Sequence, residues 1–276
     1  MKKFKITLAG LDEQIVPKWV TQEFVNNDIN FVVYECKTRE DLAKYGGDAD
    51  VIWLFGGSKI LKAENFSVIP RCGAVIRSGS GTDNVAVTEA TRLGIIVSNT
   101  PGAISHDVAE HAIGLLFTIV RQIVSQDRGV RQGIWDAKLA YPRWHIQGQT
   151  LGLVGFGNSA QLFASKMKGF DMRFLVYDPY VSAKKIASLG ARQVALEQLL
   201  VESDFISLHC PLTSETKFLI SEDELRLMKS EAILVNTSRG PVVKEIDLVR
   251  ALTEGWIAAA GLDVLDPEPP QLNNPL

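Results

Sequence analysis

The sequence predicts an α/β protein with two domains, each built on a doubly wound parallel sheet. Short runs rich in Val, Ile, Leu and Phe alternate with helical patterns almost from the first residue. Alternation of this kind favours parallel sheets that are covered by helices on both faces. The length of 276 residues exceeds the usual size of one domain, and a glycine-rich turn at Gly155–Ala160 opens a second series.

In the first series the apolar runs predict strands and the patterns between them predict helices. We expect strands at 4–9, 30–35, 50–55, 74–78 and 95–98. Helices are expected at 17–26, 39–45 and 84–93, the last ending at Gly94. These elements predict a first domain over residues 1–100.

A long helical pattern follows, from about residue 104 to residue 133. Apolar residues such as Val108, Leu115 and Ile119 recur in it at helical spacing. Because no strand comes directly after it, we interpret it as a connector helix, followed by an irregular crossing segment at 135–149. The second domain is therefore predicted over residues 101–276, with hinges near 100 and 148. Its strands are expected at 150–155, 172–177, 191–194, 204–208, 233–237 and 257–262.

The composition limits the classes of partner. Hydrophobic residues make up 46% and charged residues 22% of the chain, as in an ordinary globular protein. A net charge of −3 gives no global basic field, so no nucleic acid partner is expected. A local Arg or a helix N-terminus can still bind a small anionic substrate. The longest apolar run, 113–120, is too short to span a bilayer, so no membrane association is expected.

The three cysteines are Cys36, Cys72 and Cys210, which are far apart and form no C-x-x-C pair. The pattern predicts neither a disulfide framework nor a metal site. Reduced thiols are typical of an intracellular protein, so we expect a cytoplasmic location.

The strongest local signal is the motif G-x-G-x-x-A between an apolar run and a helical pattern. Gly155 permits a tight turn, Gly157 lets the backbone approach a pyrophosphate, and Ala160 allows close packing of helix on strand. Asn158 and Ser159 would open the helix, whose free N–H groups and positive dipole end favour phosphate.

Asp178 lies at the end of the next predicted strand, where a carboxylate binds the ribose hydroxyls of a dinucleotide. Its charge would repel a 2′-phosphate, so the pattern favours NAD over NADP. The alternative interpretation is a plain glycine turn and a solvated Asp in an α/β domain without a cofactor.

Two further segments follow apolar strands near the end of the chain. Arg239 comes directly after the run that ends at Thr237, and an acidic loop, 263–269, follows the run that ends at Leu262. Ligands of open α/β sheets bind at the carboxyl ends of the strands. A guanidinium there is a fixed fork for a carboxylate and an adjacent carbonyl oxygen.

With these motifs in order, the chain resembles the D-isomer-specific 2-hydroxyacid dehydrogenases, the family of phosphoglycerate dehydrogenase, hydroxypyruvate reductase and D-lactate dehydrogenase. The resemblance covers most of the chain. The matching segments are 77–84, 99–102, 108–110, the glycine motif, 209–212 with Thr216, 236–240 and 262–269. It implies a flavodoxin-like substrate domain, a Rossmann domain that binds NAD, and a small 2-hydroxy or 2-oxo acid as substrate.

The resemblance also implies roles for single residues. Arg239 would bind the substrate's carboxylate and reacting carbonyl, and Glu268 would orient a catalytic histidine and raise its pKa. Asp263 would contact the nicotinamide carboxamide. The remaining cofactor residues would be His209, Cys210, Pro211, Thr237 and, on the nicotinamide side, Ser80. The loop 77–81, with Arg77, Ser78 and Gly79, would bind the substrate's carboxylate through backbone N–H groups.

Two positions depart from the family pattern. Asn158-Ser159 stands where the family usually has Arg-Ile, so one charge near the pyrophosphate is lost while the backbone contacts remain. Leu265 replaces a common aromatic residue, which we interpret as a change in packing.

The proton donor that the resemblance implies is a histidine in a Pro-His pair about twenty residues beyond the Glu-Pro of the acidic loop, tuned by a carboxylate near pH 7. The sequence ends at Leu276, before that point. Of the four histidines, His209 fits the cofactor loop, His106 and His111 fit helix-capping or domain-interface roles, and His145 lies in the crossing segment. None is a convincing substitute.

Two explanations therefore stay open. In the first, which we favour because Arg239 and Glu268 are both retained, the chain is C-terminally truncated relative to an active dehydrogenase and lacks the helix that returns to the first domain. In the second, the chain is an inactive NAD(H)-binding sensor or regulatory module. Family resemblance also implies a homodimer, for whose interface Trp135, Tyr141 and Trp144 are candidates.

Overall fold

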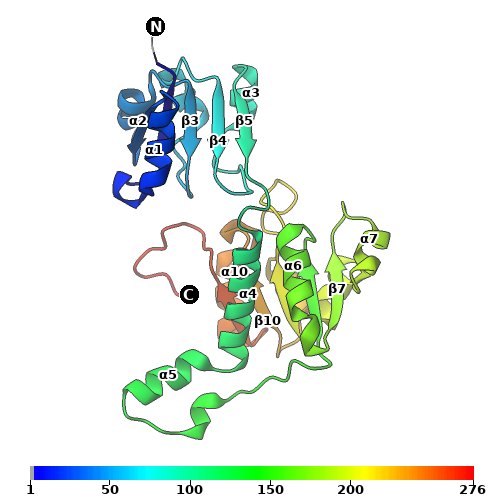
Figure 1. Cartoon of the computed structure of the whole chain (residues 1–276). Helices are drawn as coiled ribbons and strands as arrows, with labels where there is room; N and C mark the ends of the chain where they lie inside the picture. Colours follow the sequence, from blue (N-terminus) through cyan, green and yellow to red (C-terminus); the bar gives the residue numbers. More distant parts are fainter. Residues whose placement is uncertain (1–2) are drawn as a thin grey trace. The chain divides into compact units, whose positions relative to one another are not determined.

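The computed structural model describes residues 3–276, and the chain divides into two compact units (Figure 1). The first unit ends at Ile104 and the second is Ser105–Leu276. Each unit has its own parallel sheet, which confirms the predicted fold class of two parallel-sheet α/β domains.

The first unit is a five-stranded parallel sheet in the order β2-β1-β3-β4-β5. The strands are β1 Lys5–Ala9, β2 Asn30–Tyr34, β3 Val51–Leu54, β4 Ala74–Arg77 and β5 Ile96–Asn99. The helices are η1 Glu13–Ile15, α1 Lys18–Asn26, α2 Arg39–Gly46, η2 Ala63–Val68 and α3 Val87–Arg92. The chain leaves β1 for β2 on one side and returns to β3 on the other, so the strand order reverses beside β1.

Apolar side chains on both faces of this sheet hold its helices in place. On one face Leu42 of α2 and Ala90 of α3 are fully buried against Ile52 and Val75 of the sheet. On the other face Phe24 of α1 stacks on Phe31, with ring centroids 4.3 Å apart. The N-terminus of α2 begins with a capping box of Thr38 and Asp41, which satisfies backbone N–H groups that the helix leaves open.

The second unit is a six-stranded parallel sheet in the order β11-β10-β9-β6-β7-β8. The strands are β6 Thr150–Val154, β7 Arg173–Tyr177, β8 Arg192–Gln193, β9 Phe205–Leu208, β10 Ile233–Asn236 and β11 Ala259–Leu262. The helices are α4 Ser105–Val120, α5 Ile123–Arg131, η3 Ala137–Ala140, α6 Asn158–Met167, η4 Lys168–Phe170, α7 Ala183–Ser188, α8 Leu196–Glu202, α9 Glu222–Leu227, η5 Gly240–Val242 and α10 Glu245–Glu254.

Two hydrophobic layers cover the faces of the second sheet. One layer contains α4, α6 and α7, and the other contains α8, α9 and α10. Successive residues of β10 alternate between the layers, since Ile233 and Val235 belong to the first and Leu234 to the second. The sheet is therefore doubly wound, and its order reverses between β6 and β9.

The expected connector helix over 104–133 is wrong as a single element. It is two helices, α4 and α5, bent by 64° at a break where Gln122 takes a left-handed φ of 53°. The buried stripe of α4 is Ala109, Ala112, Leu116 and Val120. This buried stripe does not continue into α5, where Ile123 and Val124 are exposed. Within residues 3–276 no single helix is long and apolar enough to cross a membrane, and α4 with α5 meets that test only as a bent pair.

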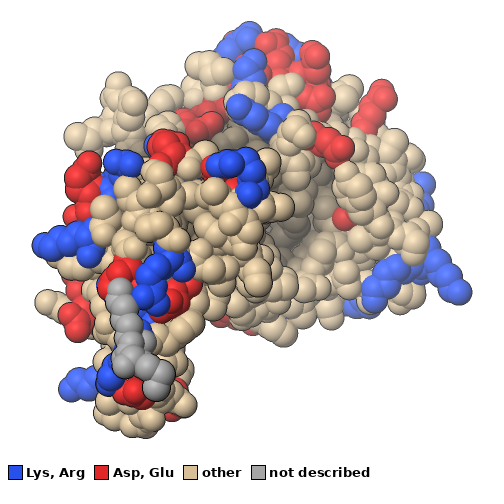
Figure 2. All heavy atoms as spheres, turned by 90° about the horizontal axis from the view of Figure 1, so that it is seen from above, with Lys and Arg blue, Asp and Glu red and all other residues tan. Residues whose placement is uncertain are grey.

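Charged side chains of both signs lie close to one another on the surface. On the face drawn in Figure 2, Lys and Arg alternate with Asp and Glu over short distances. Among the described residues, no three His, Cys, Asp or Glu side chains are grouped to hold a metal ion.

Candidate active site

The glycine turn between β6 and α6 depends on both of its glycines, for different reasons. Gly155 has a φ of +86°, and a Cβ there would lie 2.7 Å from the backbone nitrogen of Cys210. The turn therefore packs directly on the chain that leaves β9. Gly157 is the N-cap of α6, and a Cβ there would meet nothing within 4 Å. The space in front of α6 is open.

The N-terminus of α6 is equipped to bind an anion. Among the described residues, the first N–H group of the helix that meets an acceptor is that of Gln161, which donates to the carbonyl of Gly157 at 3.0 Å. In the described part of the chain no acceptor meets the N–H groups of Asn158, Ser159 and Ala160. These three donors and the helix dipole together favour a phosphate at this point. Ala160 is fully buried, as close packing of α6 on the sheet requires.

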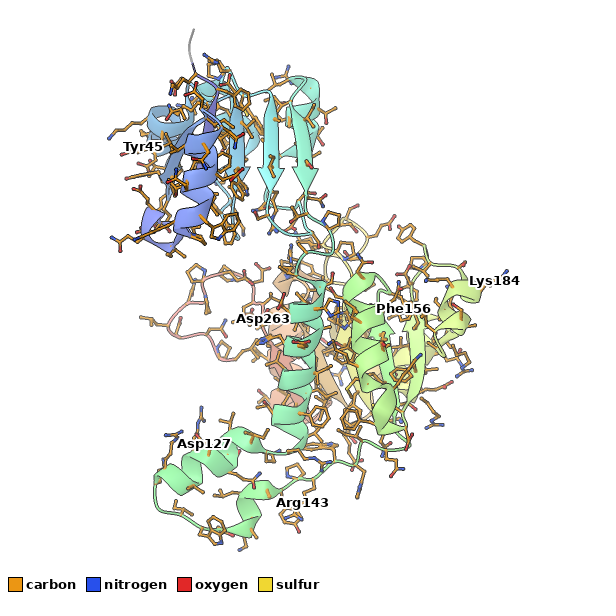
Figure 3. The ribbon with its side chains drawn as sticks, viewed as in Figure 1. Tyr45, Asp127, Arg143, Phe156, Lys184 and Asp263 are labelled. Carbon is orange, nitrogen blue, oxygen red and sulfur yellow. The ribbon has the colours of Figure 1, made fainter. Side chains whose placement is uncertain are left out.

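Asp178, directly after β7, is held at the edge of the same turn. Its Oδ2 accepts from the N–H of Phe156, which is labelled in Figure 3, at 2.7 Å. Its Oδ1 accepts from the N–H groups of Tyr180 at 2.8 Å and Val181 at 3.0 Å. A carboxylate has about four lone-pair positions, so one on Oδ2 remains for a ligand hydroxyl. The three N–H groups fix the direction of the carboxylate.

The segment after β9 supplies the floor beneath the turn. The His209 imidazole lies between Ser207, whose Oγ is 3.0 Å from Nε2, and the ring of Phe163. Burial lowers the pKa of His209 to about 4, so it is neutral near pH 7 and cannot donate a proton there as an imidazolium. Burial likewise raises the pKa of the Cys210 thiol to about 11. Pro211 accepts from the Thr216 hydroxyl at 2.5 Å, which shapes the loop that follows.

After β10, a side-chain amide fixes the segment that carries Arg239. Asn236 accepts from the N–H of Ser238 at 3.0 Å and donates to the carbonyl of Arg239 at 2.9 Å. Arg239 is half-buried, and its Nη1 donates to the carbonyl of Ser238 at 2.7 Å. The Thr237 hydroxyl is buried without a hydrogen-bond partner among the described residues. A buried hydroxyl in that state calls for a ligand or water.

The acidic loop after β11 packs on the Arg239 segment. A Cβ on Gly240 would lie 1.9 Å from the carbonyl oxygen of Leu265, so the two backbones are in contact. Glu268 is exposed, and its Oε1 accepts from the N–H of Leu265 at 3.0 Å. Arg239 and Glu268 therefore lie on neighbouring segments at one edge of the sheet.

Two contacts of this loop were missed by the sequence analysis. The imidazole Nε2 of His111 on α4 lies 3.2 Å from Oδ1 of Asp263, which Figure 3 shows beside α4. A signal for this pairing existed, because His111, Leu115 and Ile119 recur every four residues, and the last two pack against Gly261 of β11. Glu245 of α10 is the second, since it accepts from the N–H of Asp266 and from the Asn274 side chain.

In the first unit, the predicted substrate loop is tightly held. The N–H of Gly79 donates to the Thr100 hydroxyl at 2.7 Å, and the N–H of Ser78 donates to the carbonyl of Leu54 at 2.9 Å. Among the described residues, the N–H groups of Ser80 and Gly81 in this loop meet no acceptor. These two are the donors best placed for the role that we expected of Ser78 and Gly79.

Arg77 supports the same loop from below. Its Nη2 donates to the carbonyl of Gly56 at 3.3 Å, and its Nη1 donates to the carbonyl of Ser78. Gly79, with a φ of +114°, has no room for a Cβ above this guanidinium.

Comparison with known proteins agrees with this geometry. Residues 113–276 match the family model described as "D-isomer specific 2-hydroxyacid dehydrogenase, NAD binding domain". A glyoxylate reductase of Pyrococcus furiosus is 40% identical over 267 residues, which are 91% of this chain and 79% of that protein. The match to another glyoxylate reductase, that of Thermococcus litoralis, spans 62% of the length of that protein.

Solved structures of the same kind superpose on the chain. A glyoxylate reductase from Paecilomyes thermophila has a TM-score of 0.87 at 30% identity, with coverage of 100% of this chain and 87% of that one. D-lactate dehydrogenase from Aquifex aeolicus, complexed with NAD and lactic acid, has a TM-score of 0.85 at 28% identity, with coverage of 95% and 77%. NAD as the cofactor, predicted from Gly155–Ala160 and Asp178, is thereby confirmed at the level of the domain.

The open N-terminus of α6, the carboxylate after β7 and the match over residues 113–276 lead to one assignment. The chain belongs to the D-isomer-specific 2-hydroxyacid dehydrogenase family.

Proposed function

We propose that the protein is an NAD-dependent oxidoreductase that interconverts a D-2-hydroxy acid and its 2-oxo acid by hydride transfer, with glyoxylate as the first oxo acid to test. The observation that carries the proposal is the carboxyl edge of the second sheet. There the open N-terminus of α6, Asp178 and Arg239 follow β6, β7 and β10. Parallel strands place these groups along one edge. The glyoxylate reductases among the relatives support this choice of substrate.

The residues present fit an NAD molecule. The N–H groups of Asn158 and Ser159 would hold the pyrophosphate, and Asp178 would accept from a ribose hydroxyl. The partnerless hydroxyl of Thr237 would lie along the cofactor. Asp263, oriented by His111, would accept from the nicotinamide carboxamide. When bound, NAD supplies the hydride donor or acceptor at its nicotinamide ring.

Arg239 would bind and polarise the substrate. A guanidinium offers two parallel donors, which suit a carboxylate oxygen and the adjacent 2-oxo oxygen. The hydrogen bonds of Asn236 and the contact of Gly240 with Leu265 fix the backbone on either side. A fixed guanidinium stabilises negative charge as it develops on the 2-oxygen.

Glu268 would orient and raise the pKa of the histidine that moves the proton. Its Oε1 accepts from the N–H of Leu265, while Oε2 meets no donor of another described residue and remains for an imidazole N–H. No hydrogen bond or ion pair joins Glu268 to a His side chain within residues 3–276. The family resemblance assigns the proton transfer to the His of a Pro-His pair, and residues 1–276 contain no such pair. We therefore expect the 276-residue chain to bind NADH and to turn over 2-oxo acids slowly or not at all.

The alternative function is an NAD(H)-binding sensor or regulatory module without catalysis. The neutral, enclosed state of His209 and the lack of a described histidine at Glu268 favour it. To separate the two, NADH oxidation is followed with glyoxylate, hydroxypyruvate, pyruvate and 2-oxoglutarate, using the protein as its own cells produce it. Turnover supports the dehydrogenase, and NADH fluorescence quenching without turnover supports the sensor.

Two further properties are part of the proposal. We propose a homodimer, because Trp135 is 93% exposed and Tyr141 is 60% exposed, and aromatic residues are enriched in interfaces. Light scattering would then give twice the chain mass of 30.3 kDa. We also propose a cytoplasmic location, which rests on the three free, buried cysteines.

A further inference from the structure

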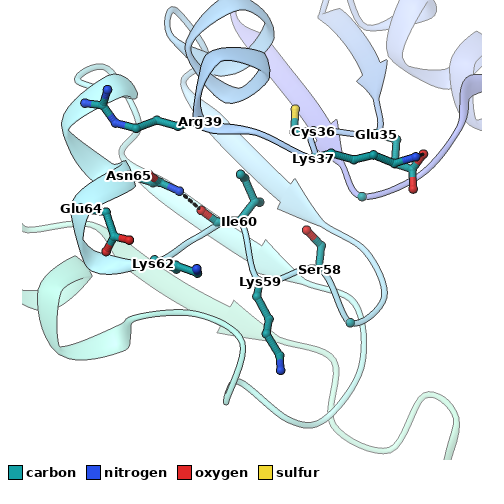
Figure 4. A pocket seen from close by; sticks show the side chains of 12 residues that line it. Glu35, Cys36, Lys37, Arg39, Ser58, Lys59, Ile60, Lys62, Glu64 and Asn65 are labelled. Atoms are coloured by element: carbon teal, nitrogen blue, oxygen red, sulfur yellow. Dashed lines mark hydrogen bonds and ion pairs between the residues drawn. The ribbon is translucent and has the colours of Figure 1, made fainter. Parts of the chain in front are cut away.

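A cavity lies in the first unit, and none of the residues assigned to the nucleotide lines it. Its volume is about 620 Å³, and it opens at the carboxyl ends of β1, β2 and β3 (Figure 4). The lining residues are Gly10 after β1, Glu35, Cys36, Lys37 and Arg39 after β2, and Gly57, Ser58, Lys59, Ile60, Lys62, Glu64 and Asn65 after β3.

This position is where an open α/β sheet binds ligands. The strand order β2-β1-β3 reverses beside β1, and the crevice outside the carboxyl ends at such a point is the usual ligand site. The turns on its two sides approach closely. Gly10 has a φ of +89°, and a Cβ there would lie 2.5 Å from the carbonyl of Phe55.

The lining is basic although the chain as a whole carries a net charge of −3. Four cations and two carboxylates line the cavity, which leaves an excess of two positive charges. Lys37 pairs with Glu35 at 2.8 Å, and Arg39 donates to the Ser67 hydroxyl at 3.1 Å. Lys62 accepts from the N–H of Asn65 through its backbone carbonyl, but the ammonium groups of Lys59 and Lys62 make no ion pair or hydrogen bond with another described residue.

Backbone donors reinforce this charge. The carbonyls of Gly56 and Ser58 accept from the Asn84 side chain at 3.2 and 2.9 Å. In a trans peptide the N–H points away from the carbonyl, so the N–H groups of Gly57 and Lys59 point away from Asn84. Both residues line the cavity, and neither N–H meets an acceptor within residues 3–276.

Two buried lining residues, Ile60 and Cys36, add no negative charge to the cavity. Ile60 is 7% exposed and Cys36 is 2% exposed. Burial raises the pKa of the Cys36 thiol to about 11, so it is uncharged near pH 7. Figure 4 shows Ser58 facing the same space as Lys62, with Arg39 and Lys59 on opposite sides of it.

We propose that this cavity binds a small dianion, a phosphate ester or a dicarboxylate, through Lys59, Lys62 and the N–H groups of Gly57 and Lys59. Ammonium groups act as point charges that suit either ligand. This site is separate from the proposed dehydrogenase chemistry and does not rest on it. Asn84 and Arg77 hold the opposite side of the Gly56–Ser58 segment, so a bound dianion would stiffen the segment beside the predicted substrate loop.

The test is a titration of the whole 276-residue chain with inorganic phosphate and, separately, with succinate, at constant ionic strength. Amide shifts of Gly57, Ser58 and Lys59 are followed by NMR. We expect saturable shifts that weaken as NaCl is raised, because the site is open to solvent. Tighter binding of phosphate identifies a phosphate ester as the ligand class, and tighter binding of succinate identifies a dicarboxylate.

Matched variants make the test specific. Lys59→Ala with Lys62→Ala should weaken binding of the dianion by about twofold to twentyfold, since each exposed ion pair contributes roughly 1.5-fold to fivefold. Lys184→Ala with Lys185→Ala removes the same charge from exposed positions on α7 and should leave affinity unchanged. Replacement of Lys59 and Lys62 by Arg should retain binding and controls for folding.

The proposal is overturned if no saturable shifts occur, if both double alanine variants bind alike, or if shifts appear only at Asn158 and Ser159. NADH binding is measured on the same samples. If NADH did not bind while the phosphate-induced shifts remained, the proposed function would be contradicted and the dianion site would be retained.

Discussion

Gly155→Ala and Gly157→Ala add the same methyl group to two glycines of one turn, and the structure predicts opposite consequences. At Gly155 the methyl carbon would lie 2.7 Å from the Cys210 nitrogen and 2.9 Å from the His209 carbonyl carbon, at a φ of +86°. At Gly157 it would enter open space, at an ordinary φ of −73°. The first change should therefore affect folding and the second should affect NADH.

The magnitudes follow from those contacts. A left-handed φ costs a residue with a Cβ roughly 1–2 kcal/mol. Overpacking against fixed backbone costs about 1–3 kcal/mol more. Gly155→Ala should thus lower the free energy of unfolding by about 2–5 kcal/mol, whereas Gly157→Ala should change it by less than about 0.5 kcal/mol. The Gly157 methyl group would occupy the space before the free N–H groups of α6, so NADH affinity should fall about tenfold or more.

Urea unfolding and NADH fluorescence titration of the two variants provide the assay. The reasoning would be refuted if Gly155→Ala unfolded at the wild-type urea concentration. It would equally be refuted if Gly157→Ala bound NADH with unchanged affinity. If Gly157→Ala lost both stability to urea and NADH affinity, the open space before α6 would be needed for folding.

Three further predictions concern single side chains. Asp178→Ala should lower NADH affinity about tenfold to a hundredfold, because one hydrogen bond to a charged group is lost. Glu197→Ala removes an exposed charge from α8 and should leave NADH affinity unchanged; equal affinities of the two variants would count against the ribose contact. Arg239→Lys should lower the affinity of the NADH complex for oxamate, a stable 2-oxo acid analogue, about tenfold, because an ammonium group cannot form the paired contact. Calorimetry measures the oxamate affinity, and an unchanged value would exclude Arg239 from the site. The pKa of His209 is about 4 in the folded chain and about 6.5 in the unfolded chain, so the unfolded state takes up the proton first as the pH falls. The contribution of His209 to the free energy of unfolding is therefore complete above pH 6.5 and is lost as the pH falls towards 4. Between pH 7.5 and pH 5 this residue should account for a loss of about 2 kcal/mol in urea unfolding that His209→Asn removes, and an equal loss in the variant would contradict the assignment.

Much of the fold was predictable because strand signals are local. The runs at 150–155 and 233–237 are apolar on both faces, as strands between two helical layers must be, and both became central strands. The glycine turn was predictable for the same reason, since its strand, turn and helix are contiguous in the sequence.

The rest depends on contacts between distant segments. The end of α4 at Val120 is followed by the left-handed backbone of Gln122, and the spacing of apolar residues does not predict this break. The pairing of His111 with Asp263 requires that β11 pack on α4. The basic cavity was missed because Lys37, Lys59 and Lys62 come together only once the strand order β2-β1-β3 is known.

Calorimetric titration of the 276-residue chain with NADH and with NADPH tests the central claim most directly. The carboxylate of Asp178, fixed by three N–H groups beside the open N-terminus of α6, predicts micromolar binding of NADH. It also predicts NADPH binding weaker by about tenfold or more, because the 2′-phosphate would face that charge. No binding of NADH, or equal affinity for the two nucleotides, would contradict the account.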